Sequence, residues 1–239
     1  DRFADSAYEG VYGMALRHVI DVLGNQPPSR FFLVSSTSVY HQSTGEWVDE
    51  SSPVMPSGFA GQRILSAERM LAEAPFPGTS IRFSGIYGGQ RTRLLEQAQA
   101  LLNQADLARP DLAQPDLAHA ARETATTPIY SNRIHEVDAV GVMAHLLALA
   151  ARGVPLKDCY LASDCEPASL GDVLAWIVER IGGAKANAIS SLPGSAPPER
   201  RRSGSKRCSN ARLRETGYHF QYPDYRSGYE EMIQRLLKI

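Results

Sequence analysis

The sequence lacks the features that mark membrane, metal-bound and disulfide-stabilised proteins. No stretch approaches the ~20 consecutive apolar residues that a helix needs to cross a bilayer. The three cysteines are too few, and odd in number, for a disulfide framework. Neither a CxxC nor an HExxH spacing occurs, so we expect no metal site. The formal net charge of -1 gives no basic field, so we expect neither nucleic acid nor membrane as a partner.

What is present is typical of a globular enzyme of the cytoplasm. Residues 1–10 are polar and mixed in charge, unlike a secretory signal, and the sparse cysteines favour a reducing compartment. Hydrophobic residues make up 43% of the chain and charged residues 21%. The 239 residues suffice for one large domain or two small ones.

Apolar spacing and Gly or Pro breakers predict alternating helices and strands. Short apolar runs predict buried strands at 30–36, 79–83 and 158–163. Helical patterns are found at about 6–23, 58–74, from 94, 133–151, 169–182, before Gly217, and 225–238. Ser169 and Asp172 are spaced as a capping box. We expect polar loops around 41–52 and 184–208, and an irregular insertion at about 103–127, where Pro110 and Pro115 interrupt the chain.

This alternation predicts an α/β fold with a parallel sheet and right-handed crossovers. The strand at 31–34 is too apolar for an uncovered edge, so we expect it to pair with a preceding strand. No strand is predicted before it in this sequence.

Five motifs, in order along the chain, resemble those of extended short-chain dehydrogenases/reductases of the NAD-dependent epimerase/dehydratase family. They are the strand and serine loop 31–40, the Asp49-Glu50 loop with Pro53, the strand and loop 81–88, the segment 132–138, and the segment 205–218. The last segment is similar to the bacterial YeeZ-like branch. The resemblance implies the C-terminal part of a Rossmann-like, doubly wound parallel sheet at 1–155. A small α/β substrate-side subdomain at 156–239, intertwined with the first part, would complete it.

The family binds NAD or NADP, and the resemblance implies the same cofactor here. Its glycine-rich turn after a first strand is missing, because Gly10 and Gly13 lie in a helical pattern with no strand before them. The residue that distinguishes NAD from NADP follows a second strand, which is also missing. The sequence therefore leaves the choice of dinucleotide open.

The family's catalytic Ser, Tyr and Lys map onto Ser36, Phe59 and Arg63. Phe59 has no proton to give and suits core packing equally well. Arg63 keeps a positive charge but cannot shuttle protons. Ser36 ends a parallel strand, where ligands bind, although a hydrogen-bonded strand exit is the alternative. Tyr87 is a substitute proton donor or a packed loop residue, and the sequence does not separate the two.

The resemblance also implies further contacts. Cofactor contacts would come from Ser35, Phe59, Arg63, Phe83, Ser84, Gly85 and Ile86. Substrate contacts would come from Thr37, Ser38, Arg133, His135, Lys206 and Arg207. A capping hydrogen bond is the preferred interpretation of His135, and a solvated loop is that of Arg200–Arg202. We expect Lys206 and Arg207 to precede a helix that Ser209 caps.

Three functional hypotheses follow. The first is an atypical NAD(P)-dependent epimerase, dehydratase or reductase for a small polar substrate, with nucleotide-linked compounds as one option. The second is a non-catalytic module that binds a dinucleotide or metabolite, which Phe59 and Arg63 favour. The third is a part of a longer polypeptide without independent function. Helices 6–23 and 58–74 correspond to the four-helix bundle of dimeric relatives, so we expect a homodimer.

Overall fold

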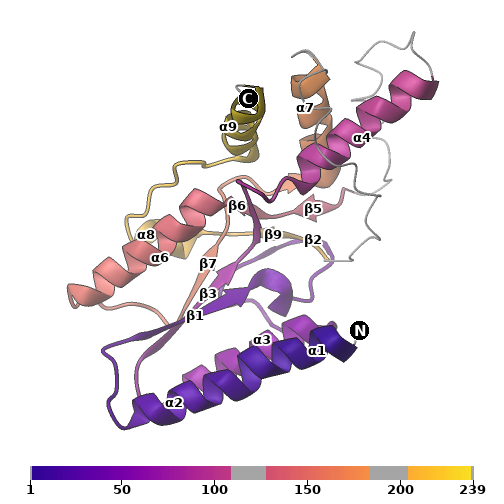
Figure 1. The fold of residues 1–239 in the computed structure, drawn as a ribbon. Helices are drawn as coiled ribbons and strands as arrows, with labels where there is room; N and C mark the ends of the chain where they lie inside the picture. The colour runs from indigo at the N-terminus through magenta and orange to yellow at the C-terminus, as the bar shows by residue number, and fades with distance from the viewer. Residues whose placement is uncertain (1, 109–127, 183–203, 238–239) are drawn as a thin grey trace.

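The central sheet consists of the three strands that the sequence predicts. The computed structural model describes residues 2–108, 128–182 and 204–237 (Figure 1). Strands β1 (Phe31–Ser36), β3 (Gly78–Phe83) and β7 (Cys159–Ala162) are all parallel and lie in the order β1-β3-β7. Ser36 pairs with Phe83, and Phe83 with Ala162, so the three strands end together. We call this end of the sheet the carboxyl edge.

Helices cover both faces of this sheet (Figure 1). On one face α2 (Leu16–Gly24) and α3 (Phe59–Ala72) pack against Leu33 and Leu161. On the other face α6 (Glu136–Ala151) and α8 (Ala211–Glu215) pack against Ile81 and Tyr160. Successive strand side chains point to opposite faces, which is why apolar strands are buried on both sides. The predicted doubly wound arrangement is confirmed.

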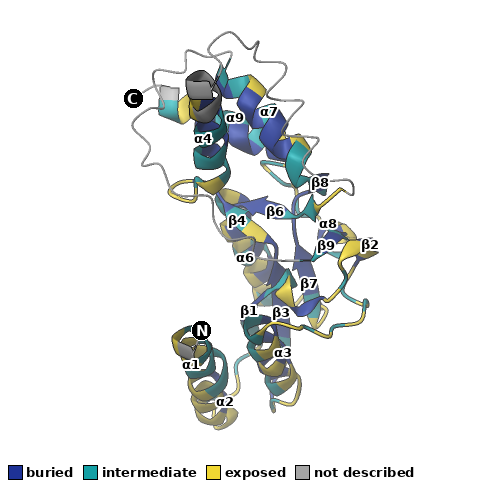
Figure 2. Ribbon diagram, turned by 90° about the vertical axis from the view of Figure 1, so that its right-hand side faces the viewer, coloured by how far each residue is buried: buried dark blue, intermediate teal, exposed yellow. Residues whose placement is uncertain are grey.

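A second apolar core lies apart from the sheet (Figure 2). It joins α4 (Arg93–Ala108), α7 (Leu170–Gly182) and α9 (Tyr225–Leu237), which share buried side chains such as Leu95, Ile177 and Ile233. Helix α4 thus packs with elements of the later part of the chain, whereas β7 joins the sheet of the earlier part. The proposed parts 1–155 and 156–239 therefore exchange elements.

The structure also contains short strand pairs that were not predicted from the sequence. Strand β4 (Gly85–Tyr87) pairs in parallel with β6 (Arg133–His135), and β5 (Tyr130–Ser131) pairs antiparallel with β8 (Ala168–Ser169). Strand β2 (Thr44–Val48) pairs in parallel with β9 (Ser205–Cys208). The predicted loops were wrong at 44–48 and 205–208. Both segments are short and polar, and they become strands only by pairing with each other across the sequence.

Several helix boundaries also differ from the prediction. The helix expected from 133 begins at Glu136, because 133–135 form β6 by pairing with β4. The first helix starts earlier, as α1 (Arg2–Tyr8), and reaches α2 through a π-helical segment, η1 (Glu9–Ala15). Helix α4 continues through 103–108, where an insertion was expected; 109–127, with Pro110 and Pro115, and the arginines at 200–202 lie outside the described residues. Ser209 does not cap α8, because its N–H still donates to Val48 in the strand pair. Asn210 takes the cap position without a side-chain bond.

Two caps follow the sequence pattern. Ser169 Oγ accepts the Asp172 N–H at 3.0 Å and donates to the Asp172 carboxylate at 2.6 Å, as in a capping box. His135 Nδ1 accepts the Val137 N–H at 3.3 Å, which is the capping hydrogen bond expected of His135; its contact with substrate stays a prediction. Within the described ranges, no helix is long and apolar enough to cross a membrane.

The outer side of β1 has no strand neighbour in the described part of the chain. Val34 is 47% exposed there, although Tyr12 Oη reaches its carbonyl at 3.4 Å. The partner strand that the sequence led us to expect is not found among the described residues.

A buried ion pair joins the sheet to α3. Arg82 on β3 donates from Nε and Nη2 to the two oxygens of Glu68, at 2.9 and 2.7 Å. Ser35 donates to the same carboxylate at 2.5 Å, and Arg82 Nη1 donates to Tyr40 Oη at 2.8 Å. The side chains of Arg82 and Glu68 are only 8% and 9% exposed. The network satisfies charges that would be costly to bury alone.

We expect Glu68→Gln to lower the free energy of unfolding by about 3–5 kcal/mol, because it leaves the buried Arg82 charge without its partner. Urea denaturation measures this change. The matched control is Glu230→Gln, which breaks the exposed Arg180–Glu230 pair and should cost less than about 1 kcal/mol. Equal, small losses in both variants would show that the buried network does not stabilise the fold.

Candidate functional site

The carboxyl edge of the sheet gathers polar side chains from three strand ends. Ser36 is the last residue of β1, Ser84 follows β3, and Asp164 lies just beyond β7. The Ser84 N–H donates to Ala162 at 3.0 Å, which holds the second and third ends together. Open parallel sheets bind ligands at this edge, so it is the candidate site.

The Ser36 hydroxyl group can donate a hydrogen bond to a ligand. Its Oγ accepts the Ser38 N–H at 3.1 Å and so caps the short 3-10 helix Thr37–Val39. Thr37 is half-buried and Ser38 exposed. This turn is seated on α3, because a Cβ at Gly61 would lie 2.4 Å from the Ser38 carbonyl oxygen. The strand-exit role and a ligand-binding role are therefore compatible in Ser36.

Ser35 does not face this site. Its hydroxyl donates to Glu68 on the α3 side of the sheet, within the buried network. Successive strand residues point to opposite faces, so Ser35 and Ser36 cannot share one ligand group. The Ser35 hydroxyl is therefore part of the buried network, and the cofactor contact that the resemblance implied stays a prediction.

The α3 positions that correspond to the family's Tyr and Lys contact the first helix. The Phe59 ring meets Tyr8 edge-on, with centroids 5.7 Å apart. Arg63 Nε and Nη2 donate to Asp5 at 2.8 and 3.2 Å, and its Nη1 lies 2.5 Å from a Glu9 oxygen. These hydrogen bonds lower the pKa of Asp5. The charge of Arg63 is thus already balanced by two carboxylates.

Some residues at the end of β3 and in the following loop lie in the core, and others lie at the candidate site. Phe83 is buried in the core beneath α6, and Ile86 packs against the same core. Gly85 is exposed and donates its N–H to Asn132 at 3.2 Å. Ser84 is 6% exposed, and its Oγ has no hydrogen-bond partner among the described residues. Of this loop, Ser84 is the side chain placed to hold a ligand.

Tyr87 points away from the sheet and into the second core. Its ring stacks on Tyr229 with centroids 4.6 Å apart and lies 5.2 Å from His135. A Cβ at Gly228 would lie 1.9 Å from the Tyr87 hydroxyl, so α9 covers it. Burial raises the pKa of Tyr87 far above its usual value, which makes it a poor proton donor. This placement favours the packing interpretation.

Arg133 and His135 lie on the same face of β6. Arg133 is 4% exposed; its Nη2 donates to the carbonyl and hydroxyl of Ser131, and its Nη1 has no partner within the described ranges. His135 Nε2 is 3.9 Å from Glu231 Oε2, and burial lowers the pKa of His135. Among the described residues, Arg133 Nη1 and His135 Nε2 both lack a hydrogen-bond partner.

Lys206 and Arg207 alternate across β9. Lys206 is 4% exposed, and burial lowers its pKa against the opposing effect of Cys208 and Glu46. Arg207 donates from Nε to Gly45 at 2.7 Å. Its guanidinium lies over the rings of Trp47 and Tyr130, at 5.2 and 4.9 Å from their centroids. Arg207 thus belongs to an aromatic stack beside β2, separate from the carboxyl edge.

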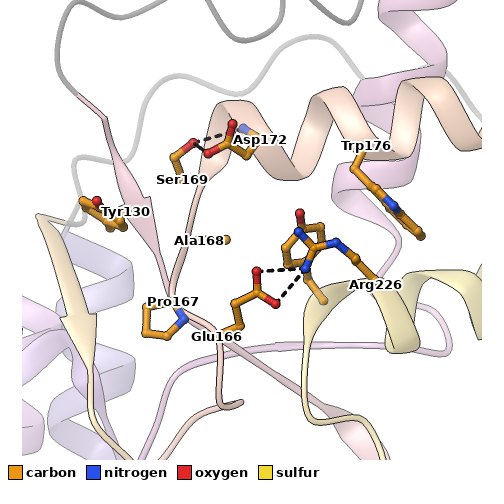
Figure 3. A pocket seen from close by; sticks show the side chains of 9 residues that line it. Tyr130, Glu166, Pro167, Ala168, Ser169, Asp172, Trp176 and Arg226 are labelled. Atoms are coloured by element: carbon orange, nitrogen blue, oxygen red, sulfur yellow. Dashed lines mark hydrogen bonds and ion pairs between the residues drawn. The ribbon is translucent and has the colours of Figure 1, made fainter.

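A surface cavity of about 320 Å³ lies at the start of α7 and α9 (Figure 3). Arg226 Nη1 spans both Glu166 oxygens across it, at 2.8 and 2.7 Å. The lining residues are Tyr130, Glu166, Pro167, Ala168, Ser169, Asp172, Trp176, Tyr225 and Arg226. None of them was predicted as a site residue.

Two groups of residues near the site were not predicted from the sequence. Asp164 follows a buried strand at its carboxyl end, and an acid in that position was a usable signal. Asp5 and Glu9 are four residues apart in the first helix, so they share one face. Their partner, Arg63, is far away in sequence, and no local pattern could have paired them.

The fold and site define a Rossmann-type α/β protein with a polar carboxyl edge. Comparison with solved structures narrows this class. A Methylobacillus flagellatus protein, classed as an NAD-dependent epimerase/dehydratase, is 35% identical with a TM-score of 0.71, and the match covers 98% of this chain and 74% of that one. The chain therefore belongs to the NAD-dependent epimerase/dehydratase family, among the extended short-chain dehydrogenases/reductases.

More distant matches show the fold alone. UDP-glucuronic acid 4-epimerase from Bacillus cereus, solved with NAD, is 14% identical with a TM-score of 0.61; the match covers 95% of this chain and 68% of that one. A human epimerase family protein, solved with NADPH, is 17% identical with a TM-score of 0.61, covering 96% and 75%. No family model and no curated protein matches the sequence.

We expect Tyr87→Phe to leave the free energy of unfolding unchanged or to raise it by up to about 1 kcal/mol. It removes a buried hydroxyl that has no partner in the described part of the chain. Thermal unfolding measures this. Gly228→Ala, which forces a methyl group onto Tyr87, should instead cost about 1–3 kcal/mol. A loss above about 2 kcal/mol in Tyr87→Phe would mean that the hydroxyl makes a bond that stabilises the fold.

Proposed function

We propose that this chain acts as an NAD(P)-dependent epimerase, dehydratase or reductase on a small polar substrate. Nucleotide-linked substrates are among the options. The observation that carries this proposal is the pair of available hydroxyls, Ser36 and Ser84, at the carboxyl edge of the parallel sheet β1-β3-β7. The sparse, free cysteines support a place in the cytoplasm.

The carboxyl edge fits part of a dinucleotide. The Ser36 hydroxyl can donate to a ligand oxygen, and Ser84 Oγ, buried without a partner in the described part of the chain, can donate or accept. When bound, a nicotinamide supplies or accepts hydride. Arg63 would contact ribose hydroxyls while its guanidinium stays paired with Asp5 and Glu9. A dinucleotide therefore fits well at the strand ends, whereas the carboxylates of Asp5 and Glu9 crowd the position beside α3.

Proton transfer is the step that this chain must arrange differently from its relatives. Phe59 has no hydroxyl, and Arg63 is held in its charged form by two carboxylates. Tyr87 is buried, and α9 covers its hydroxyl. These residues favour the second candidate, a non-catalytic module that binds a dinucleotide or metabolite. Binding without turnover would distinguish this candidate from the enzyme.

We expect NADH or NADPH to bind with micromolar affinity, measured by titration calorimetry. Ser36→Ala should weaken binding about threefold to tenfold, because one hydrogen bond contributes about 0.5–1.5 kcal/mol. The control is Ser57→Ala, in the exposed loop before α3, which should bind as the wild type does. If neither dinucleotide binds the wild type, the proposed function is wrong for this chain.

We also propose a homodimer built on the first helices. The outer side of α1, η1 and α2 exposes Phe3 (90%), Val11 (63%), Met14 (59%) and Val22 (70%). Exposed apolar residues gathered on one surface mark interaction sites. The corresponding helices form the dimer in many relatives, as the resemblance implies.

We expect sedimentation at micromolar concentration to show a dimer for the wild type and a monomer for Val11→Glu/Val22→Glu, because buried charges oppose association. Val140→Glu is the control, since Val140 is 70% exposed but lies on α6. A monomeric wild type, or a dimer broken by the control alone, would contradict this interface.

A further inference from the structure

Asp164 is a buried acid that the proposed function does not use. It follows β7 at the carboxyl edge and is 1% exposed. Neither carboxyl oxygen has a hydrogen-bond partner within the described ranges. The Asp164 N–H donates to the Arg133 carbonyl at 2.7 Å, and Ser163 Oγ donates to the same oxygen at 3.2 Å. The backbone is therefore fixed while the carboxyl group is unsatisfied.

The groups around Asp164 do not stabilise its charge. Arg133 is the cation beside it, but its Nη2 is bound to Ser131 and its guanidinium lies over the Tyr225 ring at 5.5 Å. The Glu166 N–H is near enough to favour the ionised form but completes no hydrogen bond. The groups that face Asp164 from the surrounding elements are Arg133, Asp224, Glu166, Tyr87, Tyr229 and Cys208.

Burial dominates, and it raises the pKa of Asp164 to about 8 despite the opposing charge of Arg133. Asp224 and Glu166 act in the same direction as burial. A carboxylic acid kept neutral in this way can both donate and accept a hydrogen bond.

Three other side chains next to Asp164 have unpartnered buried atoms. Ser84 Oγ, Tyr87 Oη and Arg133 Nη1 have no hydrogen-bond partner within the described part of the chain. The Ser84 N–H bonds to Ala162 at the end of β7, and the Asp164 N–H bonds to the Arg133 carbonyl, so these three residues lie at adjacent strand ends. Tyr87 is close enough to Asp164 and Arg133 to interact with them electrostatically. Buried polar atoms in native proteins almost always have a partner, either protein or a bound molecule. Apart from Tyr87 Oη, which α9 covers, these unsatisfied atoms and the Asp164 carboxyl group therefore mark a place for a polar ligand.

We propose that Asp164, Arg133 and Ser84 bind an uncharged carbonyl or hydroxyl oxygen, with Asp164 as the acid that donates to it. Arg133 and Ser84 add donors from β6 and from the end of β3. An anionic ligand is disfavoured, because Asp224 and Glu166 carry charge of the same sign nearby. The site deepens the proposed function, because reduction of a carbonyl needs a proton as well as a hydride and Phe59 has none.

The first test is a direct titration of Asp164 in the ligand-free protein. Carbon NMR of labelled aspartate side chains follows each carboxyl group, and Asp164→Asn identifies the signal of Asp164. We expect its midpoint near 8. Asp158→Asn, in the exposed loop before β7, should leave that signal unchanged. A midpoint below about 5 would show an ionised aspartate paired with Arg133, and the proposal would be overturned.

Stability gives an independent readout of the same state. The unfolded Asp164 ionises near pH ~4, whereas the folded one keeps its proton until about pH 8. Between these values the folded state binds more protons, so stability falls as pH rises. We expect the wild type to lose stability relative to Asp164→Asn across this window. A constant difference would contradict the neutral acid.

The second test uses dihydroxyacetone as an uncharged probe and acetate as an anionic one. We expect dihydroxyacetone to shift the Asp164 signal and the amide signals of Ser84 and Arg133, while acetate leaves them unchanged. Ser84→Ala should weaken this binding about threefold or more. Shifts with acetate alone would show that the site prefers an anion. Shifts with neither probe would leave only ordered water at the site. Either result would overturn the proposal. Neither test requires dinucleotide binding, so failure of the proposed function remains distinguishable.

Discussion

The buried pairing of Arg82 with Glu68 holds the functional edge in place. Arg82 lies on the central strand and Glu68 on α3, and the same network takes in Ser35 of β1 and Tyr40 beyond the serine turn. A charge can stay inside only while its partners keep their geometry. The network therefore fixes two strands and α3 relative to one another. Ser36 is adjacent to Ser35, so its position at the carboxyl edge follows from this constraint.

The chain keeps its family's scaffold while it changes the groups that surround the site. Phe59 and Arg63 contact the first helix, where Tyr8 packs against the Phe59 ring and two carboxylates bind the Arg63 guanidinium. In exchange, the edge carries hydroxyls from Ser36 and Ser84 and an acid, Asp164, that burial keeps protonated. The site thus favours hydrogen bonds to uncharged oxygen atoms over strong binding of anions.

Much of the fold could be read from the sequence, because the main strands and helices carry local signals. The apolar runs that became β1, β3 and β7 are buried whatever their neighbours, and the Ser169–Asp172 cap needs only a spacing of three residues. Strands β2 and β9 were missed because polar segments become strands only with a partner, and these partners are far apart in sequence. The site shows the same division: Ser36 was placed at the carboxyl edge from its strand end, whereas the contacts of Ser35 with Glu68 and of Tyr87 with Tyr229 required the packed structure.

By itself, the sequence determined the class of fold, the family and the absence of a tyrosine proton donor at Phe59, since each depends on residue type and order along the chain. Tertiary structure alone decided which side chains are available. The charge of Arg63 is balanced by ion pairs with Asp5 and Glu9, and the Tyr87 hydroxyl is covered by the backbone of Gly228. Asp164 becomes a neutral acid by losing its contact with water. Burial and charge pairing are set by residues distant in sequence, so no local pattern specifies them.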